Sequence, residues 1–393
     1  MAPIVCKRNS SKWHTRAAHT IASTPDNQTV TARLVGLILL GFVRLLFVAA
    51  PYSPTPRFSP PPGFLNTNAD PSGRGHIMNH GLMDQIAALH WVQENIGAFG
   101  GDPGSVTLLG HGTGAACIHF LMASAAVVPG LFQRAVLMSG SAFSPWATVD
   151  NPTHYALKYG RALNCTANMT PVAEPGHRRD PPPKPSNKEL DEMVNCLKEK
   201  SLEDLQAVHI SAPQFLYPFG PSVDGIVIKK DYRREMRKRA DEGSREYDLL
   251  FGVVPHEAFD LFTADDVDRG FDLERRDRIF RTMVRNAYDY HLNEVFISLV
   301  NEYTNWEQPD PQPYEIRDAT LAALSDALYV APLLTAANNA RMGHKNQYFY
   351  VFNHTSLHAA RPYVSTAPHA PPTPLTLHTA TYTSTTNSCR ERN

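Results

Sequence analysis

Residues Phe99–Cys117 read FGGDPGSVTLLGHGTGAAC, and this stretch decides the fold. The apolar run Val106–Leu109 predicts a short buried strand, and Ala115–Ala123 predicts a helix. Between them lies the glycine-rich turn Gly110–Gly114. A Gly-x-Ser-x-Gly turn between a strand and a helix presents a nucleophilic serine at a sharp corner. Gly112 occupies the serine position, so the sequence predicts this corner without its nucleophile.

The same turn has two other interpretations. Gly110-x-Gly112-x-x-Ala115 matches a dinucleotide-binding fingerprint, but the acidic residue expected about twenty positions later is missing. Alternatively, the glycines could simply allow a close approach of helix and strand. That explanation accounts for the glycines but not for the residues around them.

Strands and helices alternate along the chain from Gly63 onward. We expect strands over residues 105–109, 135–138, 247–254 and 347–352, and helices over 81–99, 115–123, 282–306 and 319–328. Pro332 is expected to stop the last helix, and the charged segment 229–246 is expected to be a solvated helix. This alternation predicts an α/β fold with a mostly parallel sheet flanked by helices on both sides.

Composition narrows the function classes. The chain has 393 residues and a formal net charge of -1, which gives no general electrostatic case for nucleic acid or an anionic membrane. Its five cysteines form no Cys-x-x-Cys pair, so we expect no metal site and no cofactor.

Residues 1–62 and 354–393 are irregular in composition, which leaves 63–353 as the expected domain. The apolar run 34–50 has about the length of a short membrane span but contains Arg44. A displaced signal or anchor, a core segment and sequence from an unreliable gene model all stay open, and we assign the run no function.

Long motifs surround the glycine-rich turn. They are Phe99-Gly100-Gly101 with Val106-x-Leu108-x-Gly110-x-x-Thr113-Gly114, Gly81-Leu82-x-Asp84-Gln85-x-x-Ala88-Leu89-x-Trp91-Val92-x-x-Asn95-Ile96, Gly130-Leu131-Phe132 and Ser139-Gly140-Ser141. Together they resemble the type-B carboxylesterases and cholinesterases over about three-quarters of the chain. The resemblance implies a partial α/β-hydrolase fold, with Gly110, Gly112 and Gly114 as a vestigial nucleophile elbow.

Within that family the serine-less pattern resembles the neuroligins, cholinesterase-like adhesion proteins of the synapse. Val223-Asp224-Gly225, Arg276-Asp277-Arg278-Ile279 and Asn301-Glu302-Tyr303-Thr304 are most similar to an insect or other arthropod neuroligin. The resemblance implies neurexin-type partners bound through calcium. It also implies a homodimer, although the C-terminal helices that build it are missing here.

The catalytic residues decide whether this chain is an enzyme. Glu257 matches the family's acid position, although an ordinary exposed loop glutamate is an equally good interpretation. The family's histidine motif is missing, and neither His354 nor His358 lies in a supporting pattern. Thr113 and Ser141 lack the elbow position.

The glycine-rich oxyanion loop expected upstream is also missing, and His111 is expected to be an ordinary turn residue. We therefore expect a catalytically inactive protein. An ester hydrolase that uses another residue, or a non-functional fragment, are the alternatives.

Several features suggest the extracellular space or plasma-membrane surface. Glycosylation patterns start at Asn164, Asn168 and Asn353, and also at Asn9 and Asn27. The resemblance implies a disulfide between Cys165 and Cys196, with two unpaired thiols as the alternative. Cys117 is expected to be a buried free thiol. The family's first strands, C-terminal helices, membrane span and cytoplasmic tail are not recognisable, so we interpret the chain as partial.

Overall fold

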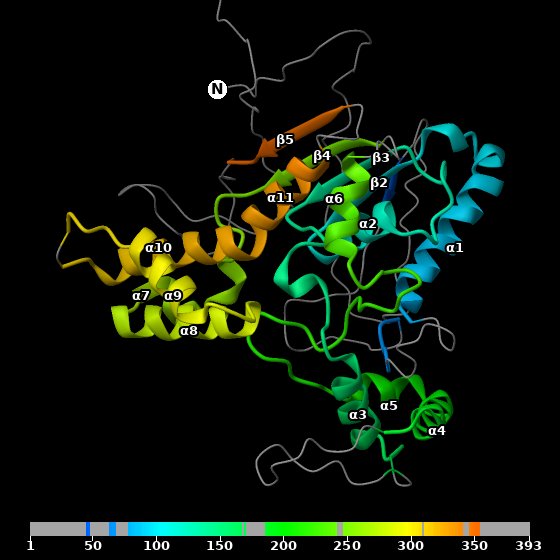
Figure 1. The fold of residues 1–393 in the computed structure, drawn as a ribbon, viewed down its shortest axis with the longest axis horizontal. Coiled ribbons are helices and arrows are strands. Elements are labelled where there is room, and N and C mark those ends of the chain that lie inside the picture. Colours follow the sequence, from blue (N-terminus) through cyan, green and yellow to red (C-terminus); the bar gives the residue numbers. More distant parts are fainter. Residues whose placement is uncertain are drawn as a thin grey trace, which may run out of the picture. The chain divides into compact units, whose positions relative to one another are not determined.

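Our computed structural model describes residues 45–47, 63–67, 78–166, 169, 185–241, 247–308, 310–340 and 346–353, all within one compact unit. Five parallel strands form one sheet in the order β1-β2-β3-β4-β5 (Figure 1). They are β1 Leu45–Phe47, β2 Thr107–His111, β3 Arg134–Met138, β4 Asp248–Val253 and β5 Gln347–Val351. The predicted parallel sheet is confirmed.

Strand β1 lies inside the apolar run 34–50. Leu45 pairs with Thr107 and Phe47 with Leu109, so this part of the run extends the sheet beyond β2. The pairing favours the interpretation of the run as a segment of the folded domain.

Eleven α-helices occur among the described residues. Their bounds are α1 His80–Asn95, α2 Thr113–Ala123, α3 Pro152–Ala162, α4 Asn187–Lys198, α5 Leu202–Ala207, α6 Tyr232–Asp241, α7 Ala264–Arg269, α8 Leu273–Ala287, α9 Leu292–Glu302, α10 Pro313–Ser325 and α11 Ala331–Ala340.

Helices α1, α2, α6 and α11 pack in sequence beside one another, and they cover one face of the sheet. Alternate strand residues on that face, including Leu108, Leu137 and Phe251, are fully buried. Each crossover joins neighbouring strands, and right-handed crossovers of this kind place their helices on the same face.

The opposite face of the sheet carries a smaller apolar cluster. Leu109, Val136 and Leu250 are only half-buried there, around Met138 and Tyr350. Helix cover was expected on both faces, and the described part of the chain shows it on one.

The start of α1 depends on a buried polar network that the sequence did not reveal. Asn79 is the N-cap, and its backbone N–H donates to Asn66 Oδ1 at 2.9 Å. Its side chain accepts from Ser222 N at 2.9 Å and donates to Asp224 Oδ2 at 2.8 Å. Asp224 Oδ1 in turn accepts from three consecutive backbone N–H groups, those of 226–228. These bonds tie segment 63–67 to the turn around 222–228.

The long helix predicted over 282–306 is wrong. The chain forms two helices, α8 and α9, which pack on each other. The break falls at Tyr288–His291, where His291 takes a left-handed conformation (φ 53°) and caps α9. Apolar spacing continued through this turn, which contains no glycine or proline, so the pattern could not reveal it.

The prediction that Pro332 ends a helix is also wrong, because Pro332 lies within the first turn of α11. A five-residue π-helical turn, Asp326–Val330, joins α10 to α11. Proline lacks the N–H that would bond the carbonyl four residues earlier, that of Leu328. The indole N–H of Trp146 donates to this carbonyl at 3.0 Å and replaces the lost bond.

Helix α6 is less solvated than predicted for segment 229–246. Tyr232 and Met236 are buried in the main core, and the Tyr232 ring packs edge-on against Phe120. The charged residues beside them, Arg233, Arg234 and Arg237, are exposed. The helix is therefore amphipathic and fixed to the domain by its apolar side.

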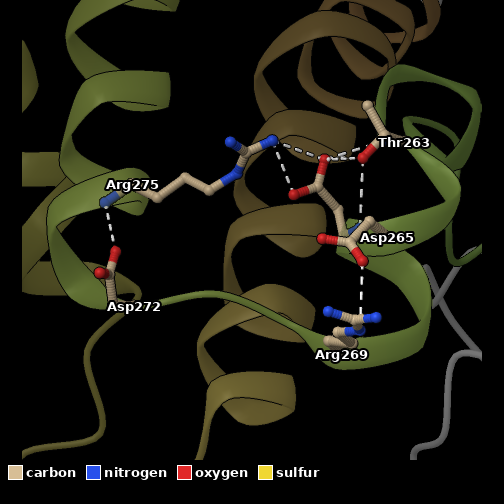
Figure 2. Close-up of polar contacts among 6 residues, drawn as sticks. Thr263, Asp265, Arg269, Asp272 and Arg275 are labelled. Atoms are coloured by element: carbon tan, nitrogen blue, oxygen red, sulfur yellow. Dashed lines mark hydrogen bonds and ion pairs between the residues drawn. The ribbon is translucent and has the colours of Figure 1, made fainter.

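Ion pairs and caps define the start of α7 and α8 (Figure 2). Thr263 and Asp266 form a capping box at α7, and Asp272 caps α8 by accepting from Arg275 N at 2.8 Å. The Arg275 guanidinium then binds Asp266 at 2.7 Å, which joins the two helices. This guanidinium and the two hydrogen bonds from Thr263 hold the pKa of Asp266 below its usual value, although burial of the carboxyl opposes them.

The segment Pro313–Asn339 has the length and apolar composition of a membrane-crossing helix. In this domain, however, half of its apolar window is buried, and Leu321, Leu324, Leu328 and Leu333 belong to the core. The side chains that would face lipid are thus used for packing the α/β domain.

The structure joins Cys165 and Cys196 in a disulfide, with 5.6 Å between their Cα atoms. Cys165 follows α3 and Cys196 lies in α4, so the bond closes the loop between the two helices. Cys117 is the free and buried cysteine among the described residues, and burial raises its pKa to about 12.

We expect secreted protein to yield the Cys165 and Cys196 peptides joined in a non-reducing digest. Closing a loop of this length removes about 3–4 kcal/mol of chain entropy from the unfolded state. The double substitution Cys165→Ser/Cys196→Ser should therefore lower the free energy of unfolding by a similar amount. Cys117→Ser serves as the control that removes a thiol without opening a loop. Recovery of both thiols free from folded, secreted protein would contradict the expectation.

Candidate functional site

The site forms where four strands end. Gly112 lies between β2 and α2, Ser139 follows β3, Glu257 follows β4, and Tyr350 lies near the end of β5. The carboxyl ends of parallel strands meet at one edge of the sheet, which is where α/β folds place their reactive groups.

The turn at Gly112 has the backbone of a nucleophile elbow. Its φ is 54° and its ψ is -114°, a combination that residues with a Cβ rarely adopt. Gly112 N donates to Met138 O at 2.8 Å, and Gly112 O accepts from Ala116 N at 3.1 Å. The turn is thus bonded both to the neighbouring strand and to the helix that it starts.

The elbow also depends on backbone contact with the next strand end. A Cβ atom at Gly140 would lie 2.2 Å from Gly112 O, and one at Gly110 would lie 2.5 Å from the carbonyl carbon of Gly114. Neither atom can move without displacing the backbone. Glycine at 110 and 140 is therefore required for the turn to fit.

Gly112 differs from those two positions, because a Cβ atom built on it would meet nothing within 4 Å. Its missing side chain would project into open space, as a nucleophile must. The geometry could accept a serine at the cost of backbone strain, but the residue present has no hydroxyl.

Glu257 lies beside this corner and is half-buried, which excludes the exposed loop glutamate considered from sequence. Its Oε1 accepts from Val254 N at 2.8 Å. Burial raises the pKa of Glu257 to about 7, and hydrogen bonds from Val254 N–H and the Ser139 side chain oppose this rise. Burial raises the pKa values of Tyr350 and Tyr329, and the nearby Glu257 charge raises them further.

Ser139 is a feature that sequence reasoning missed. It has a φ of 54°, left-handed for a residue with a Cβ, and its backbone N–H donates to Gly252 O at 2.7 Å. Strained non-glycine residues tend to collect at functional sites. The sequence marked it only as part of the Ser139-Gly140-Ser141 motif after a buried strand, without a role at the corner.

Among the described residues, no histidine donates a hydrogen bond to Glu257, whose partners are Val254 N–H and the Ser139 side chain. His256, the residue before Glu257, is half-buried with an unbonded Nδ1, and burial followed by the Arg317 charge lowers its pKa.

His354 and His358 lie outside the described residues, and His111 is exposed on the turn. His119 is buried on α2, where its Nδ1 accepts from Ala142 N at 3.2 Å and its ring packs edge-on against Phe143. That acceptor role requires an unprotonated Nδ1, so His119 holds the loop after β3.

The two hydroxyl residues considered as substitutes do not reach the elbow position. Thr113 is the first residue of α2. Ser141 is fully buried, and its Oγ accepts from Phe143 N at 3.2 Å. Ser141 thus forms a local turn.

Two of the predicted glycan acceptors can be placed. Asn164 is exposed at the end of α3 with a φ of 57°, and Asn353 is exposed after β5. Asn168, Asn9 and Asn27 lie outside the described residues. Among the described residues, no group of three or more His, Cys, Asp or Glu could hold a metal ion.

Comparisons with known proteins agree with this architecture. Residues 61–393 match the model of the carboxylesterase family. Neuroligin-1 of Caenorhabditis elegans is 38% identical over 276 residues, which are 69% of this chain and 33% of that protein. Neuroligin-3 of Mus musculus and neuroligin-2 of Rattus norvegicus are each 33% identical, over 79% and 78% of this chain and 35% and 34% of their own lengths. The chain thus spans about a third of the length of these relatives.

The raised pKa of Glu257 predicts a pH dependence of stability. The folded protein keeps this proton up to about pH 7, whereas the unfolded chain loses it near 4.5, so ionisation favours unfolding. Raising the pH from 4.5 to 8 should lower the free energy of unfolding by on the order of 3 kcal/mol through this group. In Glu257→Gln, which stays neutral, that decrease should be absent.

Urea unfolding at a series of pH values measures the difference between the two proteins. Glu307→Gln, a substitution at an exposed glutamate, is the matched control and should follow the unsubstituted protein. Parallel stability curves for Glu257→Gln and the unsubstituted chain would contradict the buried, neutral carboxyl.

Proposed function

Because the chain belongs to the carboxylesterase family, we propose that it is a catalytically inactive, cholinesterase-like adhesion protein of neuroligin type. One observation carries the proposal: the elbow is intact in its backbone, yet its tip is Gly112, which has no hydroxyl. The similarity to three neuroligins supports the same function.

Acyl transfer needs a nucleophile, a base that takes its proton, and donors for the oxyanion. Gly112 cannot attack an ester. We take Glu257 as the family's acid position, and the hydrogen bonds to its carboxyl come from Val254 N–H and the Ser139 side chain rather than from a histidine. A carboxyl that holds its proton up to about pH 7 is also a poor orienting group at neutral pH.

We propose the extracellular plasma-membrane surface at synapses as the location of the complete protein. The Cys165–Cys196 disulfide supports an oxidising compartment, and the exposed acceptors Asn164 and Asn353 fit it. The proposed partner is a neurexin-type cell-surface protein bound through calcium. A homodimer belongs to the same proposal.

Restoring the serine tests whether the nucleophile is the only missing part. We expect Gly112→Ser to fold, because its side chain meets open space, at a strain cost of about 1–3 kcal/mol. Neither the unsubstituted chain nor the variant should hydrolyse p-nitrophenyl acetate above a denatured control or react with a fluorophosphonate probe. A serine hydroxyl depends on a histidine base to become reactive at neutral pH.

Gly140→Ala is the contrasting variant, and we expect it to be strongly destabilised because its Cβ would overlap Gly112 O. A rise of several powers of ten in ester hydrolysis by Gly112→Ser, removed by His354→Ala or His358→Ala, would contradict the expectation. Probe labelling of the unsubstituted chain that unfolding abolishes would favour the alternative of an ester hydrolase.

Partner binding is the direct test of adhesion. We expect the immobilised, secreted full-length chain to bind a soluble neurexin ectodomain saturably in millimolar calcium. This binding should disappear when excess chelator removes the calcium. Gly112→Ser should bind equally, because the elbow is not the proposed contact surface. Folded protein with its disulfide intact that binds no neurexin ectodomain would overturn the proposed partner.

A further inference from the structure

The end of helix α3 combines a helix cap, a glycan acceptor and a disulfide. Asn164, Cys165 and Thr166 form an Asn-x-Thr acceptor sequence with Cys165 in its middle. The same Cys165 is bonded to Cys196 of α4. The acceptor sequence and the disulfide therefore cannot take up independent conformations.

Asn164 closes α3 as the left-handed residue of a Schellman motif. Its backbone N–H donates to Arg161 O at 3.0 Å, and that of Cys165 donates to Gly160 O at 2.8 Å. Asn164 has a φ of 57° and is exposed. Asparagine tolerates this backbone better than most residues with a Cβ, so the cap alone explains Asn164. The cap does not explain the threonine two residues later.

The other two residues of the acceptor sequence are packed against the domain. Cys165 is buried and Thr166 is half-buried. A Cβ atom at Gly160 would lie 2.4 Å from Met193 Sδ and 3.2 Å from Thr166 Cγ2, so both side chains pack onto the bare backbone of α3. Met193 belongs to α4, the helix that also carries Cys196. The closed disulfide thus holds α4 against the segment that contains Thr166.

Glycan transfer requires this segment to enter a transferase. The amide nitrogen of Asn164 would form a bond to the anomeric carbon of a lipid-pyrophosphate-linked oligosaccharide. The bond from that carbon to the pyrophosphate oxygen breaks, the lipid pyrophosphate leaves with the electron pair, and the amide loses one proton. The acceptor motif also requires a hydroxyl at its third residue. With Asn164 fixed in the cap and Thr166 packed, the folded domain cannot present both groups without opening the end of α3.

We propose that Asn164 is an N-glycan site that is modified only before the Cys165–Cys196 disulfide closes, so that disulfide formation limits its occupancy. Cys196 lies 31 residues after Cys165. Synthesis at about 5–20 residues per second delivers Cys196 about 2–6 s after Cys165. Disulfide formation then takes seconds or longer, which leaves an interval for transfer. The inference rests on the extracellular location in the proposed function but needs neither adhesion nor neurexin.

The test compares the occupancy of Asn164 in the full-length chain and in Cys196→Ser. Both are expressed in secretory cells, and cells and medium are pooled so that retained protein is counted. Cys196→Ser leaves the acceptor sequence unchanged and removes only the disulfide partner. Enzymatic removal of glycans in heavy-oxygen water converts each occupied asparagine to a labelled aspartate, and peptide fragmentation separates Asn164 from Asn168. Occupancy of Asn164 should rise at least about twofold in Cys196→Ser, because disulfide closure no longer ends the interval for transfer.

Asn353 and Cys117 supply the matched controls. Asn353 is exposed after β5, and its acceptor sequence contains no cysteine, so its occupancy should not change. Cys117→Ser alters a buried free thiol and leaves the disulfide closed, so it should not raise the occupancy of Asn164. Equal occupancy of Asn164 with and without Cys196 would overturn the inference. An equal rise at Asn353 would overturn it as well, because the effect would then be general misfolding.

Secreted protein gives a second readout. The exposed Asn164 leaves room for a glycan in the folded domain, so a non-reducing digest should contain the Asn164 glycopeptide joined to the Cys196 peptide. Thr166→Ala should remove this glycan and keep the disulfide. Glycans confined to chains without the disulfide would overturn the proposed order of events.

The two glycan sites also separate this inference from the proposed function. Glycan on Asn353 and none on Asn164 in any variant would remove the inference and leave the extracellular location. Absence of glycan from both sites would count against the location as well. Neurexin binding is measured independently and does not bear on either result.

Discussion

The contact between Gly112 and Gly140 is the constraint on which this fold depends. The carbonyl of Gly112 lies so close to Gly140 that any Cβ there would overlap it, and Gly112 itself has a φ of 54°. Through this contact β2, β3 and α2 meet at one point, and α2 is the most deeply buried helix of the layer. A glycine at 112 relieves the strain that a serine would add, while the packing requirement at 140 remains. The geometry of the corner therefore serves packing whether or not its tip carries a hydroxyl.

Glu257 is the half-buried carboxyl beside the glycine corner. The carboxyl is half-buried beside Ser139 and near two tyrosines, and its pKa is raised to about 7 by burial. An active triad would stabilise the ionised acid through a histidine N–H. Here the described donors are Val254 N–H and the Ser139 side chain. These two do not offset the cost of burying a charge, so the carboxyl stays protonated up to about pH 7. The neutral Glu257 side chain therefore contributes packing and hydrogen bonds, and no negative charge, below about pH 7.

The sequence predicted those features that depend on local pattern. Glycine spacing around 110–114 predicted the elbow, and short apolar runs predicted β2, β3, β4 and β5 to within two residues. Patterns failed where distant residues decide the structure. Trp146 donates to the Leu328 carbonyl, which Pro332 leaves unbonded, from 182 positions away along the chain, and Asn79 is held by Ser222 from 143 positions away. The break before His291 needs no glycine or proline, so periodicity alone could not locate it.

Helix α6 shows how two apolar residues fix a charged segment to the core. Its seven basic residues and three acids between 229 and 241 predicted solvation, and that is correct for one side of the helix. Two apolar positions four residues apart, Tyr232 and Met236, were enough to bury the other side against the core. A charged segment that was merely solvated would move freely, and its charges would spread apart. Because α6 is fixed by packing, its exposed cations keep a defined place on the domain. The apolar pair thus fixes where α6 lies, and the charged residues between and beside it face solvent.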